Sequence, residues 1–229
     1  MPTRRFPVVT VGLIVLNVLV YLWEVGGSGL EAHVYEWGYY PCDIEGPCVG
    51  PAVGHAPLWA MTFSSMFMHG GLLHLGGNML FLWIFGNNVE DALGHVKFLL
   101  WYLAAGLAAT AVQTFVTLQW GNAQEASIPN VGASGAIAGV LGAYFLLHPR
   151  AGVLTAIVLG FFFVLREIPA IFFLGIWFLF QLIEGGFGIV HPESGGGVAF
   201  FAHVGGFVFG LLTVRLLASR RPEPRSLRF

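Results

Sequence analysis

The sequence predicts an all-α membrane protein with six transmembrane helices, and three observations lead to this fold class. Hydrophobic residues make up 56% of the 229 positions and charged residues only 10%, whereas a soluble domain has about 25% charged residues. So few charged side chains cannot cover a surface that faces water. Six apolar runs approach the roughly 20 residues that a helix needs to cross a bilayer. The positive charges of the chain fall on one side of the resulting arrangement.

Each predicted span is an apolar stretch bounded by polar or glycine-rich residues. The six stretches lie near residues 7–24, 68–88, 97–119, 132–149, 168–186 and 199–217. Together they define one membrane domain, residues 1–218, which is followed by a basic tail at 219–229. The first run follows two arginines, as in a signal peptide, but no convincing small-residue cleavage site follows it. We therefore interpret this run as a retained membrane anchor.

The distribution of charge decides between six and seven spans. Residues 151–186 fit either two short spans or one span preceded by a segment at the membrane surface, because Arg166 and Glu167 interrupt the apolar run. With six spans, all ten Lys and Arg residues lie on the side of the N-terminus. The loops on the other side contain none, namely 25–67, 120–131 and 187–198. Since positive loops stay in the cytoplasm, we expect both termini there and residues 151–167 along the inner interface.

Polar residues early in the second, fourth and sixth spans share one depth in the outer leaflet, because these three spans enter from the outer side. They are His74, Asn78, Ser134 and His203. His74 and Asn78 are four residues apart and therefore lie on one helix face. Polar groups inside a membrane are costly and usually functional. An isolated polar residue more often links helices, and this is our interpretation of Asn17 and Gln113.

Small residues predict close contact between the fourth and sixth spans. One stripe on the fourth span consists of Gly132, Gly135, Gly139 and Gly142, and one face of the sixth consists of His203, Gly206 and Gly210. Because small residues let helix backbones approach closely, the serine of one span should reach the histidine of the other.

A serine and a histidine at one depth indicate nucleophilic catalysis. Serine is a weak nucleophile until a base removes its proton, and a neutral imidazole is suited to that task. Since no Asp or Glu is expected at this depth, Ser134 and His203 would form a dyad. The side chains of His74 and Asn78, and the backbone N–H of Ser134, can donate hydrogen bonds to an oxyanion.

These segments resemble the signatures of the rhomboid family of intramembrane serine proteases. The similar segments are Gly132-Ala133-Ser134-Gly135, His74 with Asn78, Ala202-His203-Val204-Gly205-Gly206, and Gly86-Asn87-Asn88-Val89-Glu90-Asp91-Ala92-Leu93-Gly94. The resemblance covers nearly the whole chain in the order of the family. It implies a six-helix core and cleavage of peptide bonds in or near transmembrane segments, without cofactor or metal. It assigns Ser134 as nucleophile, His203 as base, and His74 with Asn78 as oxyanion donors.

The resemblance also implies partners and a location. Transmembrane proteins would be the substrates, within a lipid bilayer that we take to be a bacterial plasma membrane with both termini cytoplasmic. A net charge of −2 argues against nucleic acid as a partner. Nothing in the sequence specifies the oligomeric state or the preferred cleavage site.

Two positions depart from the pattern of the family. Many members have Trp-Arg in the first loop, whereas Trp59 is followed here by Ala60. Some bacterial members place a tyrosine four residues after the serine, stacked on the histidine, whereas this chain has Ala138. The base must therefore be oriented by other residues.

Two other classes of function remain as alternatives. A metal-dependent hydrolase could use His69, His74 and His203 as ligands, but the chain lacks an HExxH motif and an acid placed to activate water. A transporter or channel should show inverted repeats or broken helices, and none is visible. A serine-directed fluorophosphonate probe separates the three classes, because only the protease should be labelled at Ser134.

The remaining candidate residues have more general roles. Cys42 and Cys48 predict a disulfide in the outer loop. The alternative is that these cysteines bind zinc with His33 or His55, although the spacing of the residues fits no standard zinc site. For His69 we expect a hydrogen bond to the first loop or a role in placing water, and for Glu90 bonds to backbone N–H groups at the inner surface. Trp177 and Gln181 share a face of the fifth span, which suggests helix packing or lipid contact. The outer end of this span, with the loop at 187–198, is our candidate gate for substrates against the second span.

Overall fold

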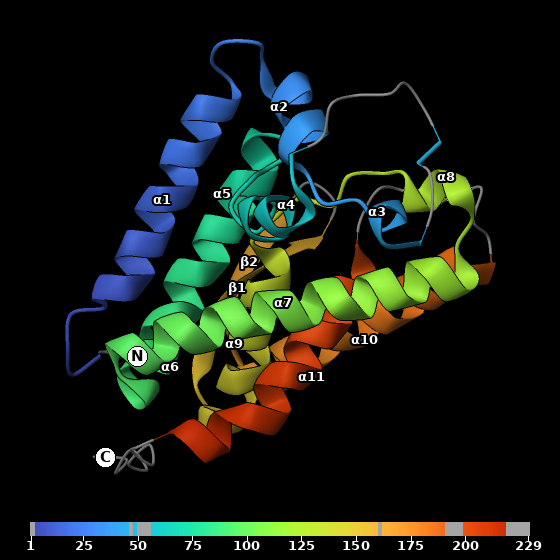
Figure 1. Ribbon diagram of the computed structural model, residues 1–229. Helices are drawn as coiled ribbons and strands as arrows, with labels where there is room; N and C mark the ends of the chain where they lie inside the picture. Colours follow the sequence, from blue (N-terminus) through green and yellow to red (C-terminus); the bar gives the residue numbers. More distant parts are fainter. Residues whose placement is uncertain (1–2, 46–47, 50–55, 160–161, 191–198, 219–229) are drawn as a thin grey trace, which may run out of the picture.

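The computed structural model describes residues 3–45, 48–49, 56–159, 162–190 and 199–218, and these are predominantly helical (Figure 1). Helices occupy all six predicted ranges. In chain order they are α1 (Val8–Glu24), α5 (Leu72–Phe81) with η1 (Leu82–Gly86) and α6 (Asn87–Leu93), α7 (His95–Trp120), α9 (Ser134–Leu147), α10 (Ala170–Val190) and α11 (Phe200–Leu217). The outer connections contain α2 (Leu30–Trp37), α3 (Cys42–Glu45), α4 (Leu58–Ser64) and α8 (Ala123–Ala126). The basic tail and the glycine run at 195–197 lie outside the described residues.

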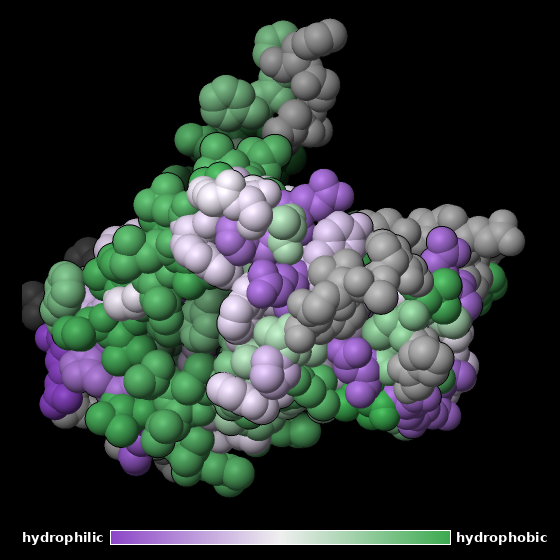
Figure 2. Space-filling model, turned by 45° about the horizontal axis from the view of Figure 1, so that its top comes forward, coloured by the Kyte–Doolittle hydropathy of each residue, from purple (hydrophilic) through white to green (hydrophobic). Residues whose placement is uncertain are grey.

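Three helices of the described chain are long and apolar enough to cross a membrane. These are α7, α10 and α11, with 26, 21 and 18 residues. Two others, α1 and α9, are apolar but shorter. The second predicted span runs without a break through α5, the π-helical turn η1 and α6. Hydrophobic side chains also cover broad areas of the surface (Figure 2). The chain is therefore a helical membrane protein, and six spans remain our proposal for its topology.

The centre of the bundle is α9, which packs against α7 and α11. Its residues are buried almost throughout, from Ala136 to Tyr144. A side chain at Gly206 or Gly210 would collide with the carbonyl groups of Gly135 and Gly139. The backbones of α9 and α11 thus touch directly, as the glycine pattern predicts, and no larger residue fits between them.

The connection between α9 and α10 is a β-hairpin of β1 (Gly152–Leu159) and β2 (Phe162–Pro169). The strands pair antiparallel from Gly152 opposite Pro169 to Leu159 opposite Phe162. The sequence left the conformation of this segment open, although its many β-branched and aromatic residues favour a strand. Each strand has 8 residues, and the apolar side chains of Leu154 and Phe163 are exposed. A place along the inner membrane interface, before a single fifth span, stays our prediction for this hairpin.

Glu90 joins the start of α1 to α6. Its carboxylate accepts hydrogen bonds from the backbone N–H groups of Val9 and Thr10, at 2.9 and 2.7 Å, and from the Thr10 hydroxyl at 2.6 Å. The first N–H groups of a helix have no partner within the helix, so the carboxylate supplies the missing acceptor. The predicted structural role of Glu90 is confirmed.

The long outer loop is fixed by a disulfide and a short backbone pairing. Cys42 and Cys48 are joined, with their Cα atoms 5.3 Å apart. Both thiols are consumed by this bond, so the alternative of a zinc site that uses them falls away. Tyr39 and Asn130 pair through their backbones, at 3.2 and 2.7 Å, and this ties the loop to the segment that leads into α9.

The isolated polar residues of the spans differ in what they connect. Gln113 of α7 accepts a hydrogen bond from the backbone N–H of Ala202 in α11, at 3.1 Å. This confirms that Gln113 links two helices. Asn17 instead donates to the carbonyl of Leu13 in its own helix, at 2.7 Å. In the described chain Asn17 thus makes no hydrogen bond to another helix, and its predicted role as a polar link between helices is wrong.

The charge distribution makes a topology prediction that reporter fusions can test. A reporter that is active only in the cytoplasm should be active when it is fused after the C-terminus, because the basic residues hold both termini inside. A reporter that is active only outside the cytoplasm should be inactive at the same position. Paired cytoplasmic and extracytoplasmic reporters at the C-terminus and in the first loop provide the measurement. An extracytoplasmic C-terminus would mean that the stretch containing the hairpin crosses the membrane.

Candidate active site

Ser134 is the first residue of α9 and is half-buried. Two residues before it, Gly132 has a φ of 137° and donates its N–H to the carbonyl of Ser65, at 2.8 Å. A Cβ at this glycine would lie 3.0 Å from the ring of His74 and 3.4 Å from the Ser134 hydroxyl. Glycine is thus required by backbone conformation and by space. The turn presents the hydroxyl at a helix N-terminus, where backbone N–H groups lack helical partners.

His74 and Asn78 reach this place from α5. The ring of His74 and the hydroxyl of Ser134 approach the same point beside Gly132, so the two side chains are neighbours. Asn78 lies one turn further along α5 and is 7% exposed, and its amide nitrogen has no hydrogen-bond partner in the described chain. A buried donor without a partner costs about 1–3 kcal/mol, so the amide is available to a ligand.

His203 lies in the first turn of α11, next to the first turn of α9. The preceding residue, Ala202, is 3.8 Å from the Cβ position of Gly135. The structure therefore brings the first turns of three helices together. Ser134 and His203 are not hydrogen bonded in the described chain; such bonds often form only when substrate is bound.

Two residues of α10 hold His203, and the sequence analysis did not assign them to the site. The Gln181 side-chain oxygen lies 2.7 Å from Nδ1 of His203, and Gln181 is 5% exposed. The ring of Trp177 lies 5.8 Å from the imidazole, between centroids. Since an amide oxygen only accepts, Nδ1 must carry the proton, which leaves Nε2 free as a base. Helix packing, the role that we predicted for these two residues, is thus only part of what they do. The sequence feature that indicated their contact with the site was a glutamine on the same face of the span as a tryptophan.

His69 lies at the start of the second span and is fully buried. Its Nδ1 donates to the carbonyl of Phe67, at 3.2 Å, so the predicted bond to the first loop is present. Its ring stands edge-on to that of His74, with 5.1 Å between centroids. His69 therefore supports a site residue and makes no contact with Ser134 in the described chain.

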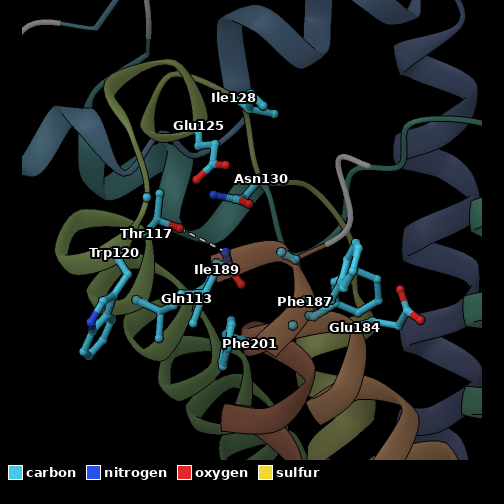
Figure 3. A pocket seen from close by; sticks show the side chains of 16 residues that line it. Gln113, Thr117, Trp120, Glu125, Ile128, Asn130, Glu184, Phe187, Ile189 and Phe201 are labelled. Atoms are coloured by element: carbon cyan, nitrogen blue, oxygen red, sulfur yellow. Dashed lines mark hydrogen bonds between the residues drawn. The ribbon is translucent and has the colours of Figure 1, made fainter. Parts of the chain in front are cut away.

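A small cleft of about 40 Å³ borders Ser134, and a larger cavity of about 260 Å³ lies beside it at the outer ends of α7, α10 and α11. The two share the residues Gln113, Asn130 and Ala199. In Figure 3, Gln113 donates to Thr117 at 3.0 Å, and the polar ends of Glu125 and Asn130 face the same space.

The walls of these cavities differ from the prediction. Because hydrolysis needs water at the dyad, the sequence predicts a cavity enclosed by the second, fourth and sixth spans and lined by His74, Asn78, Ser134 and His203. Of these four residues, Ser134 alone lines the described cleft, and α7 replaces the second span as a wall. The reason lies in the outer half of α5, where no atom comes within 4 Å of the Cβ positions of Gly76 and Gly77. This side of the site is open rather than enclosed.

The fold and this group of side chains define a class: a helical membrane protein in which a serine, an asparagine and two histidines gather at the ends of three helices. Comparison with known proteins is more specific. A Rhomboid domain matches residues 56–220, well over half of the chain. The protein belongs to the rhomboid family.

Individual relatives match shorter segments. The chain is 40% identical over 85 residues to the rhomboid protease GluP of Bacillus subtilis, which covers 37% of this chain and 15% of GluP. It is 37% identical over 92 residues to the mitochondrial rhomboid protein 1 of Saccharomyces cerevisiae, covering 39% and 25%. It is 34% identical over 135 residues to the human mitochondrial presenilin-associated rhomboid-like protein, covering 58% and 31%. The matched segments thus span less than a third of these relatives.

Proposed function

We propose that this protein is an intramembrane serine endopeptidase that hydrolyses peptide bonds in or near transmembrane segments of other membrane proteins. Ser134 is the nucleophile and His203 the base. The observation that supports this most is that α9 and α11 touch through glycine, so that Ser134 and His203 lie in the first turns of two helices in direct contact. Gln181 then leaves the correct nitrogen of His203 free.

The reaction proceeds by acyl transfer. Nε2 of His203 takes the proton of Ser134 while Oγ attacks the carbonyl carbon of the scissile peptide bond. The resulting oxyanion accepts hydrogen bonds from His74, from the Asn78 amide and from the Ser134 backbone N–H. His203 then protonates the leaving amine, and the C–N bond breaks. A water molecule, deprotonated by His203, attacks the acyl-enzyme in the same manner and releases the new carboxyl group and Ser134.

Substrate access is proposed between α5 and α10. At its inner end α10 contacts the second span, because the ring of Phe173 lies 6.4 Å from that of Phe81 and 6.3 Å from that of Phe85. Phe180 lies two turns beyond Phe173 on the same face and is 53% exposed. Trp177 packs on His203 instead, so Phe180 is the bulky residue of α10 that fits this gate.

Location and partners follow from the same proposal. The protein would reside in a bacterial plasma membrane with both termini in the cytoplasm, so that the site faces the outer side. Its partners would be transmembrane proteins and the surrounding lipid, and the chemistry needs no cofactor. Mitochondrial relatives show that the family is not confined to bacterial membranes.

A fluorophosphonate probe tests the reaction class directly. The purified protein in lipid vesicles should be labelled covalently, and peptide mapping should place the label on Ser134. Cleavage of a fluorescent transmembrane reporter should fall in proportion to labelling and should not respond to a metal chelator. A label on another serine, or cleavage that stops on chelation, would contradict the proposal.

The contact between Gln181 and His203 makes a separate prediction. Gln181→Leu removes the acceptor at similar size and should lower kcat by about 10–100-fold, the usual effect of losing a hydrogen bond that orients a functional histidine. Gln181→Glu retains an acceptor and should remain within a few-fold of the unaltered protein. Leu182→Ala, on the exposed side of the same helix, is the control. Equal kcat for all three variants would show that Gln181 does not orient the base.

A further inference from the structure

Glu24, the last residue of α1, is a carboxylate buried at the end of an apolar helix. It is fully buried, and its two oxygens lie 3.1 and 3.2 Å from the backbone nitrogen of His69. No Lys or Arg of the described chain forms an ion pair with it. Because burial of an uncompensated carboxylate is costly, its presence needs a reason beyond the packing of α1.

The hydrogen bond from His69 fixes the point at which α5 starts. Two glycines, Gly70 and Gly71, separate His69 from the first residue of this helix, and no side chain caps it. No atom lies within 4 Å of the Cβ positions of these glycines. Among the described residues, the side-chain acceptor for the backbone of this turn is Glu24, which reaches it from 45 residues earlier in the chain.

This turn also determines where His74 lies. The buried ring of His69 packs edge-on against the ring of His74, and the ring of His74 approaches the Ser134 hydroxyl beside Gly132. A continuous set of contacts thus leads from the Glu24 carboxylate, through His69, to the proposed oxyanion donor. A shift of the turn would move the exposed His74 relative to Gly132 and Ser134.

We propose that Glu24 is a positioning residue, whose hydrogen bond to the His69 backbone places His74 for the developing oxyanion. The proposal rests on the proposed function, because it concerns the step in which His74 donates. It assigns a task in the reaction to the first span, which contributes no residue that touches the substrate. This positioning requires a hydrogen-bond acceptor in the side chain at position 24 and does not require a negative charge there.

Three variants separate positioning from stability. Glu24→Met removes the acceptor at similar size, and Glu24→Gln keeps one. The control is Asn17→Ala, because Asn17 is also a fully buried polar residue of α1 but bonds only within that helix. Each protein is reconstituted in vesicles, and kcat, KM, the rate of fluorophosphonate labelling and the thermal unfolding midpoint are measured.

We expect Glu24→Met to lower kcat and the labelling rate about 10–100-fold with little change in KM, since one oxyanion donor is worth about 10²–10³ in rate and is displaced here rather than removed. Glu24→Gln should stay within about threefold. Asn17→Ala should lower the unfolding midpoint without a comparable loss of kcat. When His74→Ala is already present, Glu24→Met should lower kcat by less than about a further threefold, because the residue that Glu24 positions is already gone.

Two results would overturn the proposal: equal kcat losses in Glu24→Met and Asn17→Ala, or losses for Glu24→Met and His74→Ala that multiply in the double variant. Ser134→Ala is measured in parallel and tests the proposed function by itself. If cleavage needs Ser134 but not an acceptor at position 24, only the positioning role is wrong. If Glu24→Met fails to accumulate in membranes, the comparison of Glu24→Gln with Glu24→Ala decides the question in the same way.

Discussion

Ser134→Ala should reduce cleavage of a transmembrane reporter to background, and His203→Ala should do the same. Each residue supplies a step that the other cannot replace, and loss of either member of such a pair costs on the order of 10⁶ in kcat. Asn78→Ala should leave partial activity, with a loss of about 10²–10³, because two other oxyanion donors remain. Initial rates in vesicles at saturating substrate give the measurement.

The controls for this prediction concern folding and contamination. Ser134→Ala should keep the thermal unfolding midpoint of the unaltered protein within a few degrees, because Ser134 donates no hydrogen bond in the described chain. His203→Ala loses the contact with Gln181, so its amount in the membrane and its unfolding midpoint are measured beside its activity. Ser127→Ala, in the outer connection after α8, should retain full activity. Full activity in purified Ser134→Ala protein would show that the nucleophile lies elsewhere.

The second large effect is expected from closing the gap between α5 and α10. Cysteines placed at the exposed Leu73 and Ile183, 92% and 59% exposed, test this gap with bis-maleimide linkers of graded length. Cys42 and Cys48 are consumed in a disulfide and do not compete for the reagent. Complete cross-linking should suppress cleavage of transmembrane substrates by an order of magnitude or more, because the substrate cannot enter from lipid.

Labelling by a small fluorophosphonate separates access from chemistry. The cross-linked protein should still be labelled at Ser134, and the same double-cysteine protein without linker should cleave normally. Linkers of increasing length should restore cleavage in steps. Phe180→Ala, which removes bulk from the same gap, should raise the cleavage rate a few-fold. Unchanged cleavage at complete cross-linking with the shortest linker would place substrate entry elsewhere.

Features that depend on local pattern were predictable from the sequence. The ranges of the apolar helices follow from hydropathy and length, and the observed bounds differ from them by a few residues at most ends. The spacing of the glycines predicted the contact of α9 with α11, because small residues repeated along one face of a helix let a second helix pack closely against that face. The bonds of Glu90 and the disulfide of Cys42 with Cys48 follow from their positions at helix ends and in an outer loop. The helix ranges and the disulfide depend on a short stretch of chain, whereas for Glu90 only the kind of bond was predictable, because its partners Val9 and Thr10 lie 81 and 80 residues away.

Features that depend on how separate helices face each other were decided by the tertiary structure. The absence of a tyrosine at position 138 showed that another residue must hold His203, but not that Gln181 does so from α10. Likewise, nothing near Glu24 in the sequence points to the backbone of His69. The wall of the Ser134 cleft comes from α7 and not from the second span. These pairings depend on the rotation of each helix about its axis, which is set by the packing of all neighbours at once and not by the hydropathy of a single span.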